Sequence, residues 1–341
     1  MRWRVVDPGR RAGAVPPVLS TLLLAALATA LAVANDAASL ELGPRERVLL
    51  VAPHPDDETI GRARLNQRVL ARGGMVRVVL VTAGDGYVEA VVHETGELRP
   101  RPAEYVAYGE RRLAEARAAL RRLGGGRIRL EFLGFPDGGL VPLLGAHLSR
   151  REPERSPTTA AERPPYRDAV WLSALYDGDD LRRELVHVLR ETQPTIVVFP
   201  DPLDRHPDHH ASGMFALLAL AEFTRDGAPL PRLLAYLVHG PSWPPGWDTA
   251  TPDARAETGP LAPPSSLPDR GLARVTISLD GAEEAGKREA LALYRSQQQV
   301  MPALLAAFVR RTEPFTVFTA DEVRRATDQA RREGLRGTVG W

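Results

Sequence analysis

The chain contains no cysteine among its 341 residues, and Lys287 is its only lysine. Without cysteine there are no disulfides and no thiolate metal sites, so a bound metal must use His, Asp or Glu. The formal net charge is only +1, which provides no overall field to attract nucleic acid or other charged partners. A hydrophobic fraction of 44% and a charged fraction of 26% are typical of a globular protein and exclude a disordered or fibrous one.

An uncharged run of apolar and small residues extends from Val18 to Ala34, and four arginines precede it. At ~1.5 Å per helical residue, this run is short for a ~30 Å hydrocarbon core. Small residues end the run before Asn35, as at a signal-peptide cleavage site. We therefore expect residues 1–36 to be a signal peptide, with an uncleaved membrane anchor or a buried core helix as alternatives. The arginines place the rest of the chain outside the cytoplasm, either secreted or anchored to the cytoplasmic membrane.

From Arg45 onward, short apolar runs alternate with helical patterns. Such alternation predicts an α/β fold with a three-layer α/β/α, Rossmann-like arrangement and a mainly parallel sheet. We expect a single large domain over residues 44–325, followed by a C-terminal helix and tail over 326–341. The expected strands are Val48–Ala52, Val76–Thr82, Ile128–Leu133, Thr195–Phe199, Leu233–Val238 and Arg274–Ser278. The expected helices are Gly61–Arg72, Ala103–Leu123, Leu181–Glu191, His210–Phe223, Glu283–Ser296 and Ala320–Arg332.

Two proline-rich stretches, residues 149–167 and 241–270, interrupt the alternation. Long loops inside a compact domain are usually functional or mobile, so we expect both to border a binding pocket. The second stretch contains Trp243 and Trp247, which either stack on a bound sugar ring or pack within their own loop.

One histidine and three acids are concentrated between Pro53 and Glu58, directly after the expected strand Val48–Ala52. Ligands in open α/β sheets bind at the carboxyl ends of strands. Closely spaced carboxylates repel one another unless a cation binds between them. We therefore interpret His54, Asp56 and Asp57 as metal-binding or catalytic residues. Capping of the following helix by one of the two aspartates is the alternative.

A second cluster, Asp204 to His210, follows the expected strand Thr195–Phe199. Both clusters lie at the carboxyl ends of strands and can converge at one edge of the sheet. Together they supply His54, Asp57 and His209 as three ligands with one open position, which is typical of a catalytic zinc. The metal lowers the pKa of its bound water toward ~7. The alternative is that these histidines lie on surface loops, and His239, at the end of another strand, faces the site or solvent.

The two clusters together, with His206-Pro207-Asp208-His209 in the second, resemble the PIG-L/LmbE family of metal-dependent N-deacetylases. The resemblance extends from about Arg45 to Phe318. Further matching segments are Thr82–Gly86, Arg112–Glu115, Gly134–Gly138 and Tyr294–Gln297. The resemblance implies hydrolysis of an acetamido group, and the expected substrate is an N-acetylglucosamine-type sugar or glycoconjugate.

The resemblance also implies a role for each matching residue. The metal ligands are His54, Asp57 and His209, and Asp56 is the general base. His206 stabilises the oxyanion or protonates the leaving amine, and Asp208 orients His206. Sugar hydroxyls are held by Arg112 and Asp137. The alternatives are that Arg112 pairs with Glu115 on the helix surface and that Asp137 is an ordinary turn residue.

The chain departs from the family pattern after the first cluster, where residues 61–67 are bulkier and more charged than in many relatives. Ala83 stands where many relatives have Asn. Neither departure removes a proposed metal ligand or the proposed base. Mixed His/Asp ligation suits Zn2+, with Fe2+ or Co2+ as alternatives. Other functions left open are hydrolysis of a non-sugar amide or a phosphoester at the same metal, and sugar binding without catalysis.

Overall fold

A mixed sheet forms the centre of the computed structural model, which describes residues 38–149, 153–247, 259–264 and 266–332. The order of its eight strands is β1-β7-β8-β6-β5-β2-β3-β4. Strands β2 to β6 are parallel to their neighbours in this group, whereas β8 is antiparallel to β6 and to β7. The strands are β1 (Ala38–Ser39), β2 (Arg47–Ala52), β3 (Met75–Thr82), β4 (Ile128–Phe135), β5 (Ile196–Pro200), β6 (Arg232–Tyr236), β7 (Arg274–Ser278) and β8 (Thr312–Phe318).

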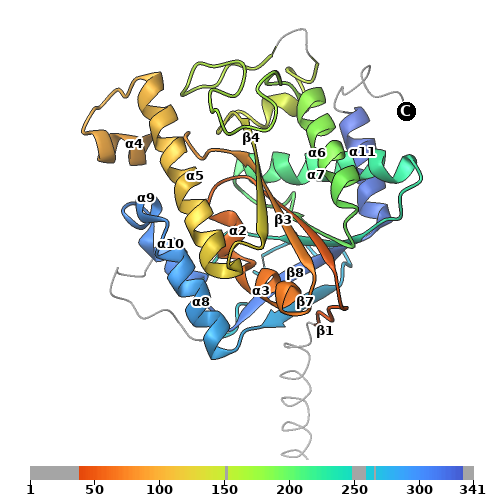
Figure 1. Cartoon of the computed structure of the whole chain (residues 1–341). Coiled ribbons are helices and arrows are strands. Elements are labelled where there is room, and N and C mark those ends of the chain that lie inside the picture. Colours follow the sequence, from red (N-terminus) through yellow and green to blue (C-terminus); the bar gives the residue numbers. More distant parts are fainter. Residues whose placement is uncertain (1–37, 150–152, 248–258, 265, 333–341) are drawn as a thin grey trace, which may run out of the picture. The chain divides into compact units, whose positions relative to one another are not determined.

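Helices cover both faces of the sheet (Figure 1). Alternate residues of β2 point to opposite faces, so Val48 and Leu50 pack with α3, α5, α8 and α10, while Leu49 and Val51 pack with α6, α7 and α11. These two hydrophobic clusters confirm the three-layer arrangement. The helices are α2 (Asp57–Ile60), α3 (Ala63–Ala71), α4 (Val88–Thr95), α5 (Pro102–Gly124), α6 (Gly178–Thr192), α7 (Pro207–Arg225), α8 (Gly281–Leu291), α9 (Arg295–Gln298), α10 (Pro302–Ala307) and α11 (Ala320–Arg332), with a 3-10 turn at Pro142–Leu144.

The order of the parallel strands creates a switch point at the centre of the sheet. The chain adds β3 and then β4 on one side of β2, and then adds β5 and β6 on the other side. Ligands in such sheets bind where the strand order reverses, beyond the carboxyl ends of the two central strands. Both predicted clusters lie there, because one follows β2 and the other follows β5. An added Cβ at Gly213 would collide with the carbonyl oxygen of Pro200, so glycine allows α7 to approach the end of β5.

The expected strands and most expected helices are confirmed, but several features differ from the prediction. Helix α7 begins at Pro207 rather than His210, and His206 is its N-cap. Helices α2, α4 and α10 and strands β1 and β8 were not predicted, and the helix expected over 283–296 is divided into α8 and α9. Helix α11 runs across the boundary predicted between residues 325 and 326 and packs against α7.

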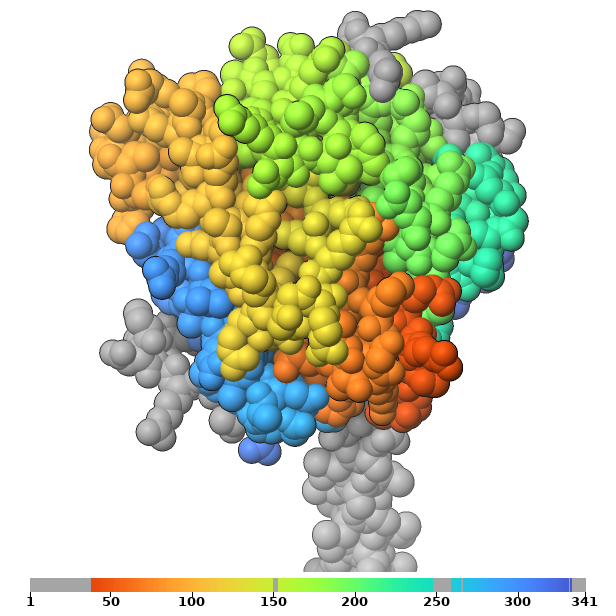
Figure 2. Space-filling view, viewed as in Figure 1, coloured from red at the N-terminus to blue at the C-terminus, as the bar shows by residue number. Residues whose placement is uncertain are grey.

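Four of the predicted segments lie wholly or partly outside the described residues. They are the predicted signal peptide or anchor, residues 150–152 of the loop 149–167, much of the loop 241–270, and residues 333–341 of the C-terminal tail. Among the residues that are described, no helix has the length and apolar character needed to span a membrane. Contacts divide the chain into a unit ending at Ala38 and a unit beginning at Ser39, and both predicted clusters lie in the second unit. On the face shown in Figure 2, the yellow-green segment between β4 and α6 lies beside the gold segment of α4 and α5.

Candidate metal centre and active site

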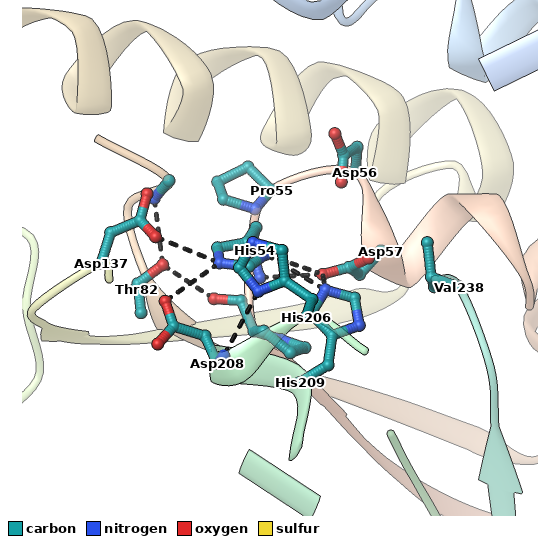
Figure 3. Close-up of polar contacts among 12 residues, drawn as sticks. His54, Pro55, Asp56, Asp57, Thr82, Asp137, His206, Asp208, His209 and Val238 are labelled. Carbon is teal, nitrogen blue, oxygen red and sulfur yellow. Dashed lines mark hydrogen bonds and ion pairs between the residues drawn. The ribbon is translucent and has the colours of Figure 1, made fainter. Parts of the chain in front are cut away.

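Three donor atoms from the two predicted clusters form a nearly equilateral triangle (Figure 3). Nδ1 of His54 lies 3.3 Å from Oδ2 of Asp57 and 3.3 Å from Nε2 of His209. Oδ2 of Asp57 lies 3.1 Å from Nε2 of His209. Ligands of a tetrahedral zinc at 2.0–2.1 Å are separated by about 3.3 Å, so the three atoms have the spacing of such a site.

The outer nitrogens of both histidines face carboxylates. Nε2 of His54 lies 3.2 Å from Oδ1 of Asp137 and 3.4 Å from Oδ2 of Asp208. Nδ1 of His209 lies 3.2 Å from Oδ2 of Asp204. A carboxylate favours the tautomer that carries its proton on the nitrogen facing it, which leaves the inner nitrogen with a free lone pair. Two lone pairs and a carboxylate oxygen that face one point repel one another, so the residues present fit a divalent cation.

The pKa shifts around the triangle also indicate that positive charge is favoured there. Burial alone would lower the pKa of His209, but Asp57 and Asp204 raise it to about 9. The carboxylates of Asp137, Asp208 and Asp57 likewise outweigh burial and raise the pKa of His54 well above its ordinary value. Burial would raise the pKa of Asp57, but His209 and His54 hold it well below the usual range. His54 and His209 therefore hold an additional proton in the metal-free protein, whereas Asp57 is ionised, and metal binding must release the two protons.

The predicted base, Asp56, is buried at the N-cap of α2 with φ 129°, a conformation that L side chains rarely adopt. Such strain persists only where the surrounding structure imposes it, often at functional sites. Its side chain makes no capping hydrogen bond, so the capping alternative does not account for it. Burial raises the pKa of Asp56 to about 7, although the guanidinium of Arg112 opposes the shift.

Arg112 lies in α5 and reaches over the first cluster. Its Nη2 donates to Oδ2 of Asp56 at 3.1 Å, and the guanidinium also donates to two backbone carbonyls, of the segments after β2 and β3, each at 2.7 Å. The alternative partner, Glu115, instead accepts from the backbone N–H and the hydroxyl of Ser296. Arg112 therefore holds Asp56 in place, and its predicted contact with sugar hydroxyls stays a prediction.

His206 faces the cavity from the start of α7. Its Nδ1 accepts from the backbone N–H of Asp208 at 3.3 Å, which leaves Nε2 as the protonated nitrogen of a neutral ring. Burial, together with His54 and His209, lowers the pKa of His206 to about 2.

The orientation of Asp208 differs from the prediction that its side chain orients His206. The carboxylate instead contacts Nε2 of His54 and accepts two backbone N–H bonds from the loop after β4, at 2.6 and 3.2 Å. The reason is its place in the first turn of α7, where the side chain turns back toward β4. Only the backbone N–H of Asp208 contacts His206.

Asp137, from the loop after β4, lies at the cavity edge beside His54. Its Oδ2 accepts from the backbone N–H of Gly86 at 2.5 Å. Burial would raise the pKa of Asp137, but His54 holds it far below its ordinary value. Asp137 is thus more than a turn residue, and its predicted role in binding sugar hydroxyls stays a prediction.

Asp204 has a position that the sequence reasoning did not assign. Besides facing His209, its carboxylate accepts backbone N–H bonds from His206 at 2.9 Å, Val238 at 2.8 Å and His239 at 3.0 Å. It therefore joins the second cluster to the segment after β6. Its place two residues before His206, inside a cluster of candidate ligands, was the signal that could have revealed it.

A cavity of about 310 Å³ opens beside the triangle and includes Asp56, Arg112, Asp137 and His206 in its lining. His239 also lines it, with its ring centre 4.8 Å from that of His209, and burial lowers the pKa of His239 to about 4. Trp243 is instead buried in the hydrophobic core and Trp247 is exposed, and the cavity lining includes neither.

Residues 49–220 match the PIG-L family, described as GlcNAc-PI de-N-acetylase. The chain is 32% identical over 263 residues to 1D-myo-inositol 2-acetamido-2-deoxy-alpha-D-glucopyranoside deacetylase 2 of Saccharopolyspora erythraea, which covers 73% of this chain and 82% of the relative. It is 28% identical over 308 residues to the corresponding deacetylase of Thermobifida fusca, covering 83% and 96% of the two chains.

A solved structure with a similar fold is N,N'-diacetylchitobiose deacetylase from Pyrococcus horikoshii, with 18% identity and a TM-score of 0.47. The similarity covers 80% of this chain and 84% of that one. The family match covers half of this chain and includes both clusters, and the first relative is matched over most of its length. The chain belongs to the PIG-L family of de-N-acetylases.

Proposed function

We propose that the chain is a metal-dependent N-deacetylase that hydrolyses the acetamido group of an N-acetylglucosamine-type sugar or glycoconjugate. The observation that carries the proposal is the triangle of His54, Asp57 and His209, with a carboxylate behind each histidine. Family membership supports the reaction class. The names of the relatives, which are deacetylases of acetamido sugars, support the substrate class.

The metal we propose is Zn2+, held by His54, Asp57 and His209, with Fe2+ as the alternative. When bound, such an ion supplies Lewis acidity and lowers the pKa of a water molecule. Two nitrogens and one carboxylate oxygen at this spacing suit Zn2+. The absence of cysteine from the chain is consistent with this ligand set.

Asp56 accepts the proton from the attacking water. A general base is most effective when its pKa lies near the working pH, and burial raises the pKa of Asp56 to about 7. The contact with Arg112 keeps the carboxylate beside the cavity rather than at the helix terminus. The backbone strain at Asp56 is consistent with a side chain held for this purpose.

His206 donates its Nε2–H to the oxygen on which negative charge develops. A neutral ring with a pKa of about 2 supports this role over protonation of the leaving amine, the other role implied by the resemblance. Preorganised donors of this kind are typically worth 10²–10³ in rate. As the C–N bond breaks, Asp56 returns the proton taken from the water to the leaving nitrogen, so the products are acetate and the free amine.

The test is release of amine and acetate by metal-loaded protein from a panel of N-acetyl sugars, non-sugar amides and phosphoesters. Asp56→Asn should lower kcat roughly 10²–10⁴-fold while metal content stays unchanged, because Asp56 is not a ligand. Asp180→Asn is the matched control, since Asp180 is also buried but lies in α6, away from the cavity. Turnover by Asp56→Asn at the wild-type rate would contradict the assigned base, and release of phosphate alone would contradict the reaction.

We also propose, from residues 1–36 alone, that the chain acts outside the cytoplasm, secreted or associated with the membrane through residues 18–34. Fractionation of cells that express the full chain, compared with a chain starting at Ala37, tests this. Equal recovery of both proteins from the cytoplasm would contradict it.

A further inference from the structure

Four apolar side chains, together called the apolar wall, are part of the lining of the 310 Å³ cavity: Ile60, Val238, Met301 and Leu304. Three distant segments contribute them, namely α2, the segment after β6 and the start of α10. Ile60, Val238 and Leu304 belong to one buried hydrophobic cluster, and Met301 packs against it. Because the wall is continuous with the core, its shape is set by the packing of the fold.

Asp137 lies away from this wall, whereas Asp57, His239 and Gln297 border it. Figure 3 shows Val238 on the Asp57 side of the site and Asp137 on the opposite side of His54. Two polar groups of the lining are engaged within the protein. Arg112 donates to Asp56 and to two backbone carbonyls, and Asp137 accepts from a backbone N–H. A substrate group that lies against the apolar wall therefore meets mainly carbon and sulfur atoms, and Oε1 of Gln297 is a buried acceptor beside Met301.

A hydroxyl group placed against the wall out of reach of Gln297 would lose its bound water without gaining a partner, which is unfavourable. A methylene group placed there would gain affinity, roughly fourfold for each one that is fully buried. We propose that the apolar wall binds an alkyl or aryl substituent of the substrate. The preferred substrates are then acetamido compounds that carry such a group close to the scissile amide.

This inference rests on the proposed function and narrows its substrate class. The substituent has two possible sources, an apolar aglycone on the sugar or an N-acyl chain longer than acetyl. The chemistry recognised by Met301 and Leu304 is the same in both cases. The two sources are therefore separated by experiment.

The experiment measures kcat/KM for amine release by the metal-loaded full chain on two series of substrates. One series is N-acetylglucosamine as its methyl, butyl, hexyl and glyceryl glycosides, and the other is methyl glucosaminide with acetyl, butyryl and hexanoyl groups on nitrogen. We expect kcat/KM to rise at least roughly tenfold from the shortest to the longest alkyl group in one series, as two buried methylenes would give. The glyceryl glycoside should gain nothing over the methyl glycoside.

Met301→Gln replaces a thioether by an amide of similar size and should lower this alkyl preference at least roughly fourfold, the effect of one buried methylene. Met75→Gln is the matched control, because Met75 is exposed at the start of β3, the end of the sheet away from the site. The alkyl preference should be unchanged in the control. The substrate series needs no variant, so a failure of Met301→Gln to fold does not prevent the test.

Equal kcat/KM along both series would overturn the inference and leave deacetylation intact. Amine release from none of the substrates, with metal bound, would instead overturn the proposed function. In that case calorimetric dissociation constants of the hexyl and glyceryl glycosides decide the question. Tighter binding of the hexyl glycoside would support the apolar wall, and equal binding would reject it.

Discussion

Replacement of Asp204 by Asn should weaken metal binding although Asp204 itself is not a proposed ligand. The amide keeps the shape of the side chain and one acceptor oxygen, but it loses the negative charge that faces Nδ1 of His209 at 3.2 Å. Three backbone N–H groups also donate to this carboxylate, so one of them loses its partner in the variant. Exchanging a charged acceptor for a neutral one costs about 1–2 kcal/mol. We therefore expect metal affinity to fall about 5-fold to 30-fold, which overlaps the range of about 10-fold to 100-fold found for comparable partners of ligand histidines.

The assay is competition for Zn2+ between the protein and a chromophoric chelator, with the visible spectrum of the Co2+ form as a second readout. Asp201→Asn is the matched control, because Asp201 is equally buried but pairs with Arg270 rather than with a histidine. The control should bind metal with wild-type affinity. Wild-type affinity in Asp204→Asn as well would refute the argument that the carboxylate sets the orientation and tautomer of His209.

Three further predictions concern stability and metal dependence. Burial raises the pKa of Glu184 to about 9, so between pH 4.5 and 9 the native state holds a proton that the unfolded chain has released. The contribution of Glu184 to the free energy of unfolding must therefore fall as the pH rises from about 4.5 to 9. Glu184→Gln removes this dependence, so the free energy of unfolding in urea should increasingly favour the variant over wild type between pH 5 and pH 9. A difference between the two proteins that stays constant over this pH range would contradict the prediction. Lys287 donates to Glu313 at 3.1 Å with both side chains buried, so Lys287→Ala should lower the free energy of unfolding by about 3–5 kcal/mol, and a loss below about 1 kcal/mol would show that the pair is not held as described. A chelator should abolish amine release and lower Tm, and Zn2+ should restore both; activity that survives complete metal removal would contradict the metal site.

The apolar strands β2, β3 and β5 were predictable because central parallel strands are buried on both faces and form continuous hydrophobic runs. Strand β8 was not, since Pro314 argues against an interior strand and polar residues interrupt its apolar pattern. The predicted start of α7, at His210, was too late. Pro207 occupies the first turn of this helix, where the N–H that proline lacks would have no partner within the helix.

The convergence of the two clusters was predictable from their positions after two strands of a parallel sheet. The direction of the Asp208 side chain was not, because it depends on the rotation of α7 relative to the loop after β4. The apolar wall could likewise not be predicted from the sequence, since Met301 and Leu304 reach the cavity only because α9 packs beside α5 and α10 packs into the core. Sequence spacing locates residues on elements, whereas the contacts between elements depend on tertiary packing.

The most direct test of the account is a crystal structure of the metal-loaded protein with anomalous diffraction recorded at the zinc absorption edge. The account predicts one strong anomalous peak within coordinating distance of Nδ1 of His54, Oδ2 of Asp57 and Nε2 of His209. A fully loaded protein with no peak at this triangle, or with its metal bound elsewhere, would contradict the proposed catalytic centre.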